Sequence, residues 1–145
     1  TRVERGYKVT MASGLGITFI ITILILLFKT HIIGIFTNEE NIIPYGTEYL
    51  TIVSPFYFMF TILFISNSVL KGAGDTLFPM FVTLLALWVV RVPISIFLSN
   101  HFGEIGIWWG IPTGWLVGMT LSTLYYFKGK WKQKKIVRDE IILVE

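Results

Sequence analysis

Four long runs of apolar residues follow one another along the chain, and each is apolar almost all round instead of along one stripe. They cover residues 11–28, 49–70, 78–98 and 105–127, so each is close to the ~20 residues that a helix needs to cross the hydrocarbon core of a bilayer. Strands with unpaired backbone groups cannot span hydrocarbon, and the runs therefore predict helices. We expect an all-α polytopic membrane protein with four transmembrane helices, the first of which extends over about 11–36.

The composition indicates that lipid surrounds these helices. The 145 residues are 54% hydrophobic and only 14% charged, whereas a soluble domain has about 25% charged residues. The mean hydropathy of +0.71 excludes a disordered segment, a coiled coil and a nucleic-acid-binding module. A single apolar run could instead be a buried helix of a large soluble protein, but four runs leave too little polar sequence to cover them.

The basic residues are distributed unevenly among the connections, and this asymmetry predicts the orientation. One side would hold the leading segment, the connection after the second run and a basic tail at 128–145, whereas the other would hold only Lys29 with four glutamates. Because short cytoplasmic loops are enriched in Lys and Arg, we expect both ends to be cytoplasmic at the plasma membrane. The basic tail could also bind anionic lipid, or it could act as a topology anchor with Trp131 at the head groups. The ten basic residues of this side are Arg2, Arg5, Lys8, Lys71, Lys128, Lys130, Lys132, Lys134, Lys135 and Arg138.

Two connections contain signals for helix ends. The sequence from Thr37 to Glu40 matches a capping box and predicts a short outer helix that starts there, unless it is a plain polar loop. Pro44 would kink or end this helix unless it falls in the first turn. Thr1 is not an initiator methionine, and the leading segment resembles the end of a cytoplasmic connection, so we expect the chain to be a fragment.

The connection after the second run is predicted to be a tight structural turn. Gly72 or Gly74 can take the left-handed conformation that ends a helix, and Asp75 or Thr76 can cap the amides of the next one. A glycine-rich run with an aspartate could also suggest a phosphate or metal site. It lacks the Gly-Lys-Ser/Thr ending of a phosphate loop, however, and one carboxylate is a poor metal site.

Small residues recur every four positions in the fourth run and predict a helix-packing seam. On a helix this spacing places them on one stripe, where another backbone can approach closely. The row consists of Gly106, Gly110, Gly114 and Gly118, and Ser122 continues it.

Polar side chains within the second and third runs are the candidates for a transport pathway. Tyr57 and Thr61 lie on nearly one face of the second run, and Asn67 lies on another. They could line a polar cavity or form hydrogen bonds between helices. Arg91 is the one formal charge within an apolar run, so it should face protein or water as an internal polar anchor, or else snorkel to the outer surface.

Catalytic chemistry is not expected. No Asp, Glu, His, Lys or Cys lies inside an apolar run, so a nucleophile would have no base beside it. His31 and His101 are single residues near the outer interface and are expected to be solvated. We therefore predict no enzymatic activity, no cofactor, no metal and no nucleic-acid partner.

Several ordered motifs resemble the C-terminal region of multidrug and toxic compound extrusion (MATE) transporters, and the resemblance spans nearly the whole chain. Phe36-Thr37 before acidic residues, Tyr49-Leu50 and the closing Trp131 also fit the pattern. The principal motifs are Val69-Leu-Lys-Gly-Ala-Gly-Asp-Thr76 with Pro79-Met80, Leu87-Trp-Val-Val-Arg-Val-Pro93, and Gly103-Glu-Ile-Gly-Ile-Trp108.

The resemblance implies helices nine to twelve of a twelve-helix, two-lobed exporter. Such transporters work by alternating access, with entry of protons or sodium driving the expulsion of organic, often cationic, drugs. Some members carry an aspartate in the middle of helix ten for sodium, and here residues 56–61 contain no carboxylate. The expected partners are membrane lipid, N-terminal helices of the same polypeptide, a small organic substrate and the coupling ion. The alternatives are a lipid-linked oligosaccharide flippase of the same superfamily and a four-span membrane scaffold.

Overall fold

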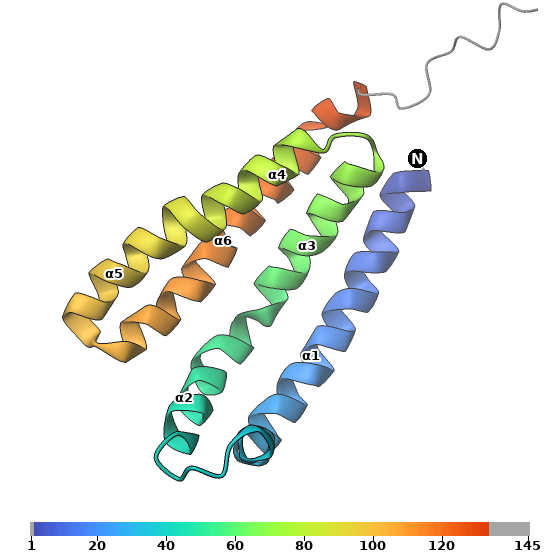
Figure 1. The fold of residues 1–145 in the computed structure, drawn as a ribbon. Coiled ribbons are helices and arrows are strands. Elements are labelled where there is room, and N and C mark those ends of the chain that lie inside the picture. The colour runs from blue at the N-terminus through green and yellow to red at the C-terminus, as the bar shows by residue number, and fades with distance from the viewer. Residues whose placement is uncertain (1, 134–145) are drawn as a thin grey trace, which may run out of the picture.

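The computed structural model describes residues 2–133, and within that range every long element is a helix (Figure 1). Lys134, Lys135 and Arg138 of the predicted basic tail lie outside the described residues. The helices are α1 (Arg2–Phe36), α2 (Ile43–Val53), α3 (Tyr57–Gly72), α4 (Leu77–Leu84), α5 (Arg91–Phe102) and α6 (Glu104–Lys128), with shorter segments η1 (Ser54–Phe56), η2 (Leu85–Val90) and η3 (Lys130–Gln133).

Helix α1 is longer than the apolar run that predicted it. It begins at Arg2, so the leading segment that resembles a connection is helical as well. Polar residues extend a helix as readily as apolar ones, and the limits of an apolar run mark only the part suited to hydrocarbon. The helix is kinked at Phe28, where φ is −110° and ψ is 15°.

The prediction of a helix starting at Thr37 is wrong. The Thr37 hydroxyl accepts a hydrogen bond from the amide of Glu39 at 3.2 Å, whereas α2 begins at Ile43 with Pro44 in its first turn. Proline is well tolerated there because the first amides of a helix have no intrahelical acceptor. Helix α2 is also not a separate outer helix, because the 3-10 segment η1 around Pro55 joins it to α3.

The turn between α3 and α4 ends α3 with two nested hydrogen bonds. The amide of Gly74 donates to the carbonyl of Lys71 at 3.0 Å, and the amide of Asp75 donates to that of Leu70 at 2.9 Å. Gly74 has φ of 91°, which a side chain would strain. Helix α4 follows with no side-chain cap at Thr76. Thr76 therefore does not supply the expected side-chain cap.

The third apolar run is divided by the π-helical segment η2, which lies between α4 and α5. Pro93 follows in the first turn of α5 and has no amide to donate to the preceding turn. The π-helical segment, in which hydrogen bonds join residues five positions apart, is wider than an α-helix and ends just before Arg91.

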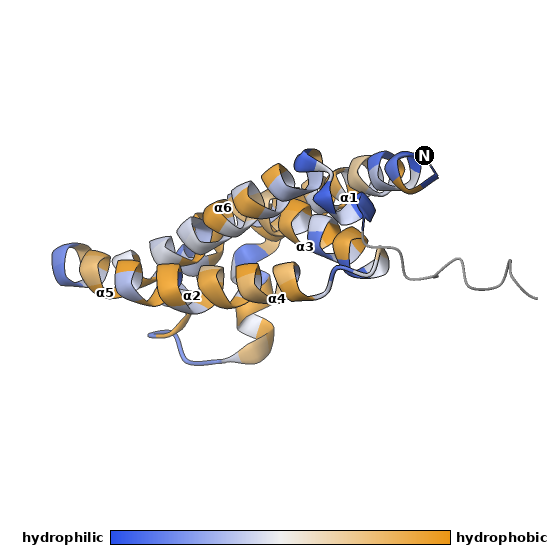
Figure 2. Cartoon of the chain, turned by 90° about the horizontal axis from the view of Figure 1, so that it is seen from above, coloured by the Kyte–Doolittle hydropathy of each residue, from blue (hydrophilic) through white to orange (hydrophobic). Residues whose placement is uncertain are grey.

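Three long helical stretches are long and apolar enough to cross a membrane: Arg2–Phe36, Ile43–Gly72 and Leu77–Phe102. The fourth predicted span, α6, has 25 residues but is not among them. Its glycines, tryptophans and tyrosines lower its mean hydropathy although they suit close packing. No residue is buried in the most apolar window of α1, and Figure 2 shows hydrophobic residues along most of the length of the helices.

Helix α6 packs against both α3 and α5, whereas α1 packs mainly against α2 and α3. The start of α1 and the end of α6 therefore meet at one end of the bundle, and the connections before α2 and after α5 lie at the other (Figure 1). A small aromatic core of Tyr7, Tyr126 and Trp131 with Leu70 lies at the end shared by the two described termini.

Candidate functional site

Asn67 lies at the centre of a buried polar cluster that joins three helices. Its side chain is 7% exposed, and its Oδ1 accepts a hydrogen bond from the Ser122 hydroxyl of α6 at 2.6 Å. Its Nδ2 faces the Thr83 hydroxyl of α4 at 3.4 Å. Thr83 in turn donates to the carbonyl of Pro79 at 2.8 Å, so the cluster ends on the backbone. One amide side chain therefore connects α3 with α4 and α6.

A small cavity of about 150 Å³ lies beside this cluster. Four polar residues line the cavity, whereas aromatic and aliphatic side chains make up the rest of its wall. The polar residues are Asn67, Ser68, Lys71 and Thr83. A cavity of this volume has room for roughly one aromatic ring. The lining includes Phe60, Leu63, Asn67, Thr83, Ala86 and Trp115.

The other three pathway candidates do not line this cavity. Tyr57 packs against the cavity residue Trp115, with ring centroids 5.9 Å apart. The Thr61 hydroxyl instead bonds to that of Thr18 in α1, at 2.6 Å. Arg91 lines a separate surface depression with Trp88 on the π-helical side. The four residues therefore do not form a single site in the part of the chain that the structure describes.

The four glycines of α6 are all buried, and two of them face the backbone of α5 or η2. A Cβ atom on Gly106 would overlap with the carbonyl of Leu98, and one on Gly114 would lie 2.8 Å from the carbonyl oxygen of Ala86. Backbone atoms cannot rotate away as side chains can, so these positions exclude any larger residue without separation of the helices.

The remaining two glycines face side chains. A Cβ atom on Gly110 would overlap with the Ser95 hydroxyl, and one on Gly118 would lie 3.0 Å from Cδ2 of Leu63 and 3.1 Å from Cβ of Ala86. The row thus contacts α5 through its first half and reaches α3 at Gly118. Such close approach strengthens van der Waals contact between helices that have no hydrophobic driving force in lipid.

Asp75 takes a role that the turn sequence does not reveal. Its side chain is 1% exposed, and its Oδ2 accepts a hydrogen bond from the Tyr125 hydroxyl of α6 at 2.5 Å. The ring of Tyr125 stacks on that of Phe78, with centroids 3.6 Å apart. The aspartate therefore holds the α3–α4 turn against α6.

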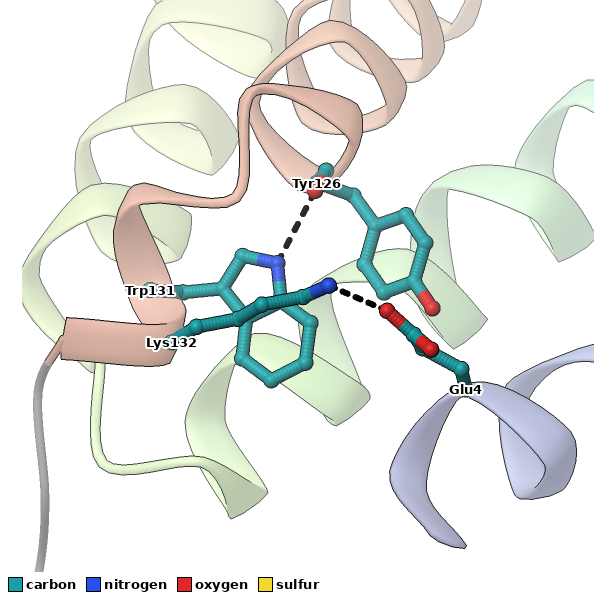
Figure 3. A network of polar contacts seen from close by, with 4 residues as sticks. All are labelled: Glu4, Tyr126, Trp131 and Lys132. Carbon is teal, nitrogen blue, oxygen red and sulfur yellow. Dashed lines mark hydrogen bonds and ion pairs between the residues drawn. The ribbon is translucent and has the colours of Figure 1, made fainter. Parts of the chain in front are cut away.

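The second polar site lies where the two described ends meet (Figure 3). The ring of Tyr7 stacks on that of Tyr126 at 4.1 Å, and the indole of Trp131 donates to the carbonyl of Tyr126 at 2.9 Å. Trp131 is only 5% exposed, so its ring packs inside the end of the bundle. Its position at the level of the head groups stays a prediction. Glu4 forms an ion pair with Lys132 in front of these rings.

The ion pair changes the acidity of Glu4, which lies ahead of the apolar part of α1. The pKa of Glu4 is lowered from 4.5 to about 2, mainly because the ammonium group of Lys132 hydrogen-bonds to the carboxylate. Glu4 therefore stays ionised at any physiological pH. The negative charge holds the polar start of α1 against η3.

The partners of Asn67 and Asp75 were not predicted from the sequence. Ser122 could be noticed because it continues the glycine row, but nothing in the sequence pairs it with a residue 55 positions earlier. Tyr7, which bonds to Ser66 at 3.2 Å, gave no signal at all. Hydrogen-bond partners across helices depend on the packing register, which local spacing does not encode.

The buried polar contacts of both sites join different helices. Over residues 2–133 the structure contains no group of three His, Cys, Asp or Glu side chains that could hold a metal ion. The fold and the three apolar stretches define an α-helical membrane protein. The buried polar side chains Asn67, Asp75 and Ser122 form hydrogen bonds that join its helices.

Comparison with known proteins identifies the family. The family model described as MatE matches residues 1–97, so the chain belongs to the MATE family of transporters, which are membrane proteins and are not enzymes. It is 32% identical over 120 residues to a probable multidrug resistance protein NorM of Thermotoga maritima, covering 81% of this chain and 26% of that protein. It is 29% identical over 118 residues to a probable multidrug resistance protein YpnP of Bacillus subtilis, with coverage of 81% and 26%. The chain thus spans about a quarter of the length of these relatives. No solved structure matches it.

Proposed function

We propose that this chain is part of the C-terminal lobe of a secondary active transporter that exports organic compounds, often cationic drugs or toxins, in exchange for protons or sodium. The observation that carries the proposal is the match to the MatE family model together with relatives named as probable multidrug resistance proteins. The chain covers 26% of the length of the Thermotoga maritima relative, so it would form only a part of such a transporter.

We also propose that α6 crosses the membrane as the fourth span. It is 25 residues long and packs between α3 and α5, which belong to apolar stretches long enough to cross. Its only ionic residues are Glu104 at the first position and Lys128 at the last. A helix of about this length covers the ~30 Å hydrocarbon core.

The proposed orientation places both described ends in the cytoplasm. Arg2, Arg5 and Lys8 lie at the start of α1, and Lys128, Lys130 and Lys132 lie at the end of the chain that meets it. The opposite end carries Lys29 among acidic residues. This asymmetry is the pattern that the positive-inside rule describes.

Among the predicted pathway residues, Asn67 has the geometry best suited to substrate contact, because it lines the cavity beside aromatic rings. Tyr57 does not line the cavity, but its ring packs on Trp115, which does, so Tyr57 would position Trp115 for the substrate. Thr61 would instead hold α1 against α3, and Arg91 would act as an internal polar anchor at the start of α5. Binding an aromatic compound in such a site would use stacking together with one or two hydrogen bonds.

Export by the complete transporter tests this function. Proteoliposomes would be loaded with a fluorescent organic cation, and its movement followed with and without an imposed proton or sodium gradient. We expect export that stops when an ionophore collapses the gradient. Export that is unaffected by ionophores would contradict the proposal, and loss of surface polysaccharide on gene deletion would favour an oligosaccharide flippase.

A further inference from the structure

A pocket of about 340 Å³ opens between the start of α1 and the end of α6. Its floor is a stack of rings in which Tyr126 lies 4.1 Å from Tyr7 and 5.4 Å from Trp131. Figure 3 shows Glu4 and Lys132 beside the rings of Tyr126 and Trp131. The lining residues are Glu4, Tyr7, Lys8, Tyr126, Phe127 and Lys132.

The charge around the pocket is strongly positive. Residues 2–8 and 128–133 together contain six basic side chains and one acidic side chain, Glu4. Glu4 forms an ion pair with Lys132. Glu4 is the one acidic residue that lines the pocket, so the pocket lining has no second acid to neutralise the charge of Lys8. Anions should therefore accumulate at this end of the bundle.

Apolar surface lies directly beside the same pocket. Phe127, which lines it, is 73% exposed, and Val9, the residue after Lys8, is 60% exposed. A soluble anion would gain nothing from such surface, whereas a molecule with a charged head and hydrocarbon chains would cover it. The pocket also lies where the apolar part of α1 gives way to polar residues, as the edge of a membrane requires.

We propose that this pocket binds the head group of an anionic phospholipid, a site that rests on the membrane placement proposed above. The phosphate diester lies against the ammonium groups of Lys8 and Lys132, and an acyl chain lies along Phe127. Basic pockets between helices on the cytoplasmic side are the general means by which membrane proteins select anionic lipids. Lys132 has a second function here, because it neutralises Glu4, which would otherwise repel the phosphate.

Native mass spectrometry of the complete purified transporter tests the site. Phosphatidylglycerol and phosphatidylcholine with identical acyl chains would be added separately, and the apparent affinity of each measured. We expect phosphatidylglycerol to be preferred. We expect Lys8→Gln to weaken its binding about fivefold, in line with about 1 kcal/mol per basic residue near the surface.

Two further variants should change the affinity for phosphatidylglycerol in opposite directions. Lys132→Gln should weaken the binding of phosphatidylglycerol by more than Lys8→Gln does, because it removes one positive charge and also the ion pair between Lys132 and Glu4. Glu4→Gln should strengthen the binding of phosphatidylglycerol, because it removes a negative charge from the pocket. Lys71→Gln is the matched control, since it removes the same charge at the same end of the bundle but away from this pocket, and it should change the affinity by less than about twofold.

Failure of the lipid site and failure of the proposed transport function would give different results. Equal affinity for the two lipids, or equal loss in Lys8→Gln and Lys71→Gln, would overturn the site while leaving the transporter proposal intact. Displacement of phosphatidylglycerol by millimolar inorganic phosphate would show a site for a soluble anion and would also overturn it. A preference for phosphatidylglycerol in a protein that exports nothing would retain the site and remove the proposed function.

Discussion

The hydroxyl of Ser122 donates a 2.6 Å hydrogen bond to Oδ1 of Asn67 in the buried interface between α6 and α3. Ser122 is fully buried and Asn67 nearly so. In a membrane protein such a bond contributes modestly to the free energy of unfolding, but it determines which helix faces meet. It also holds the Asn67 amide beside the cavity.

Removal of either partner should destabilise the protein. Ser122→Ala and Asn67→Ala each leave the other polar group buried without its principal partner, and each should lower the free energy of unfolding by about 1–3 kcal/mol. The double variant should lose less than the sum, with a coupling energy of about 0.5–1.7 kcal/mol. Thermal unfolding of the complete transporter in detergent measures both. Ser68→Ala is the control, because Ser68 is exposed and bonds to the backbone of its own helix. Strict additivity would contradict the paired geometry.

The glycine row of α6 should tolerate substitution unequally. Gly106→Ala places a methyl group against the Leu98 carbonyl and should cost about 1–3 kcal/mol. Gly110→Ala meets the Ser95 hydroxyl, which can rotate away, and should cost less. Gly110→Leu and Gly114→Leu should each abolish expression or transport, because the larger side chain forces the helices apart. The measurements are thermal stability for the alanine variants and efflux for the leucine variants.

His101→Ala is the control for the same series. The side chain is exposed at the end of α5 and bonds to the carbonyl of Phe97 in its own helix at 2.9 Å, so little should change. Normal transport in Gly114→Leu would show that α6 does not approach η2 as closely as the structure indicates.

The turn after α3 allows a matched pair of substitutions. Gly74 has φ of 91°, so Gly74→Ala should destabilise the protein by about 1–2 kcal/mol. Gly72 has open space around its Cβ position and lies at the end of a helix, so Gly72→Ala should be neutral or slightly stabilising. Chemical or thermal unfolding distinguishes the two. Equal effects would show that the left-handed residue is not at position 74.

The ion pair between Glu4 and Lys132 should make the stability of the protein depend on pH in a defined direction. The pKa of the Glu4 carboxyl is lowered to about 2, mainly by Lys132, against 4.5 when the chain is unfolded. The stabilisation by this pair is therefore complete above pH 4.5 and is lost as the pH falls toward 2. A carbon-13 titration of the Glu4 carboxyl should show the low midpoint, and Lys132→Gln should return it toward 4.5. A wild-type midpoint near 4.5 would mean that α1 and η3 do not meet.

The helical class was predictable because apolar length is a local property of the sequence. The runs predicted four helices, and the four-residue spacing of Gly106 to Gly118 indicated a face that the structure places against α5, η2 and α3. The limits of the runs were less informative. Residues 2–10 are helical without being apolar, and Pro44 allows a later helix start than the Thr37 motif suggested.

Contacts between distant residues were not predictable. Asp75 follows a glycine turn and could have capped α4, but its carboxylate faces Tyr125, 50 positions away. Trp131 follows basic residues, and nothing near it in the sequence indicates that its ring packs on that of Tyr126. In both cases the partner depends on the tertiary packing, which the local motif does not encode.

Cysteine labelling of the complete transporter, in a background free of other cysteines, tests the central claim that the chain crosses the membrane with both described ends on the cytoplasmic side. Single cysteines would replace Lys8, Lys130, Asn38 and Asn100 in turn, and intact cells would be treated with a membrane-impermeant maleimide. We predict that Asn38→Cys and Asn100→Cys react from outside, whereas Lys8→Cys and Lys130→Cys react only after permeabilisation. Labelling of Lys8→Cys and Lys130→Cys from opposite sides of the membrane would contradict the account.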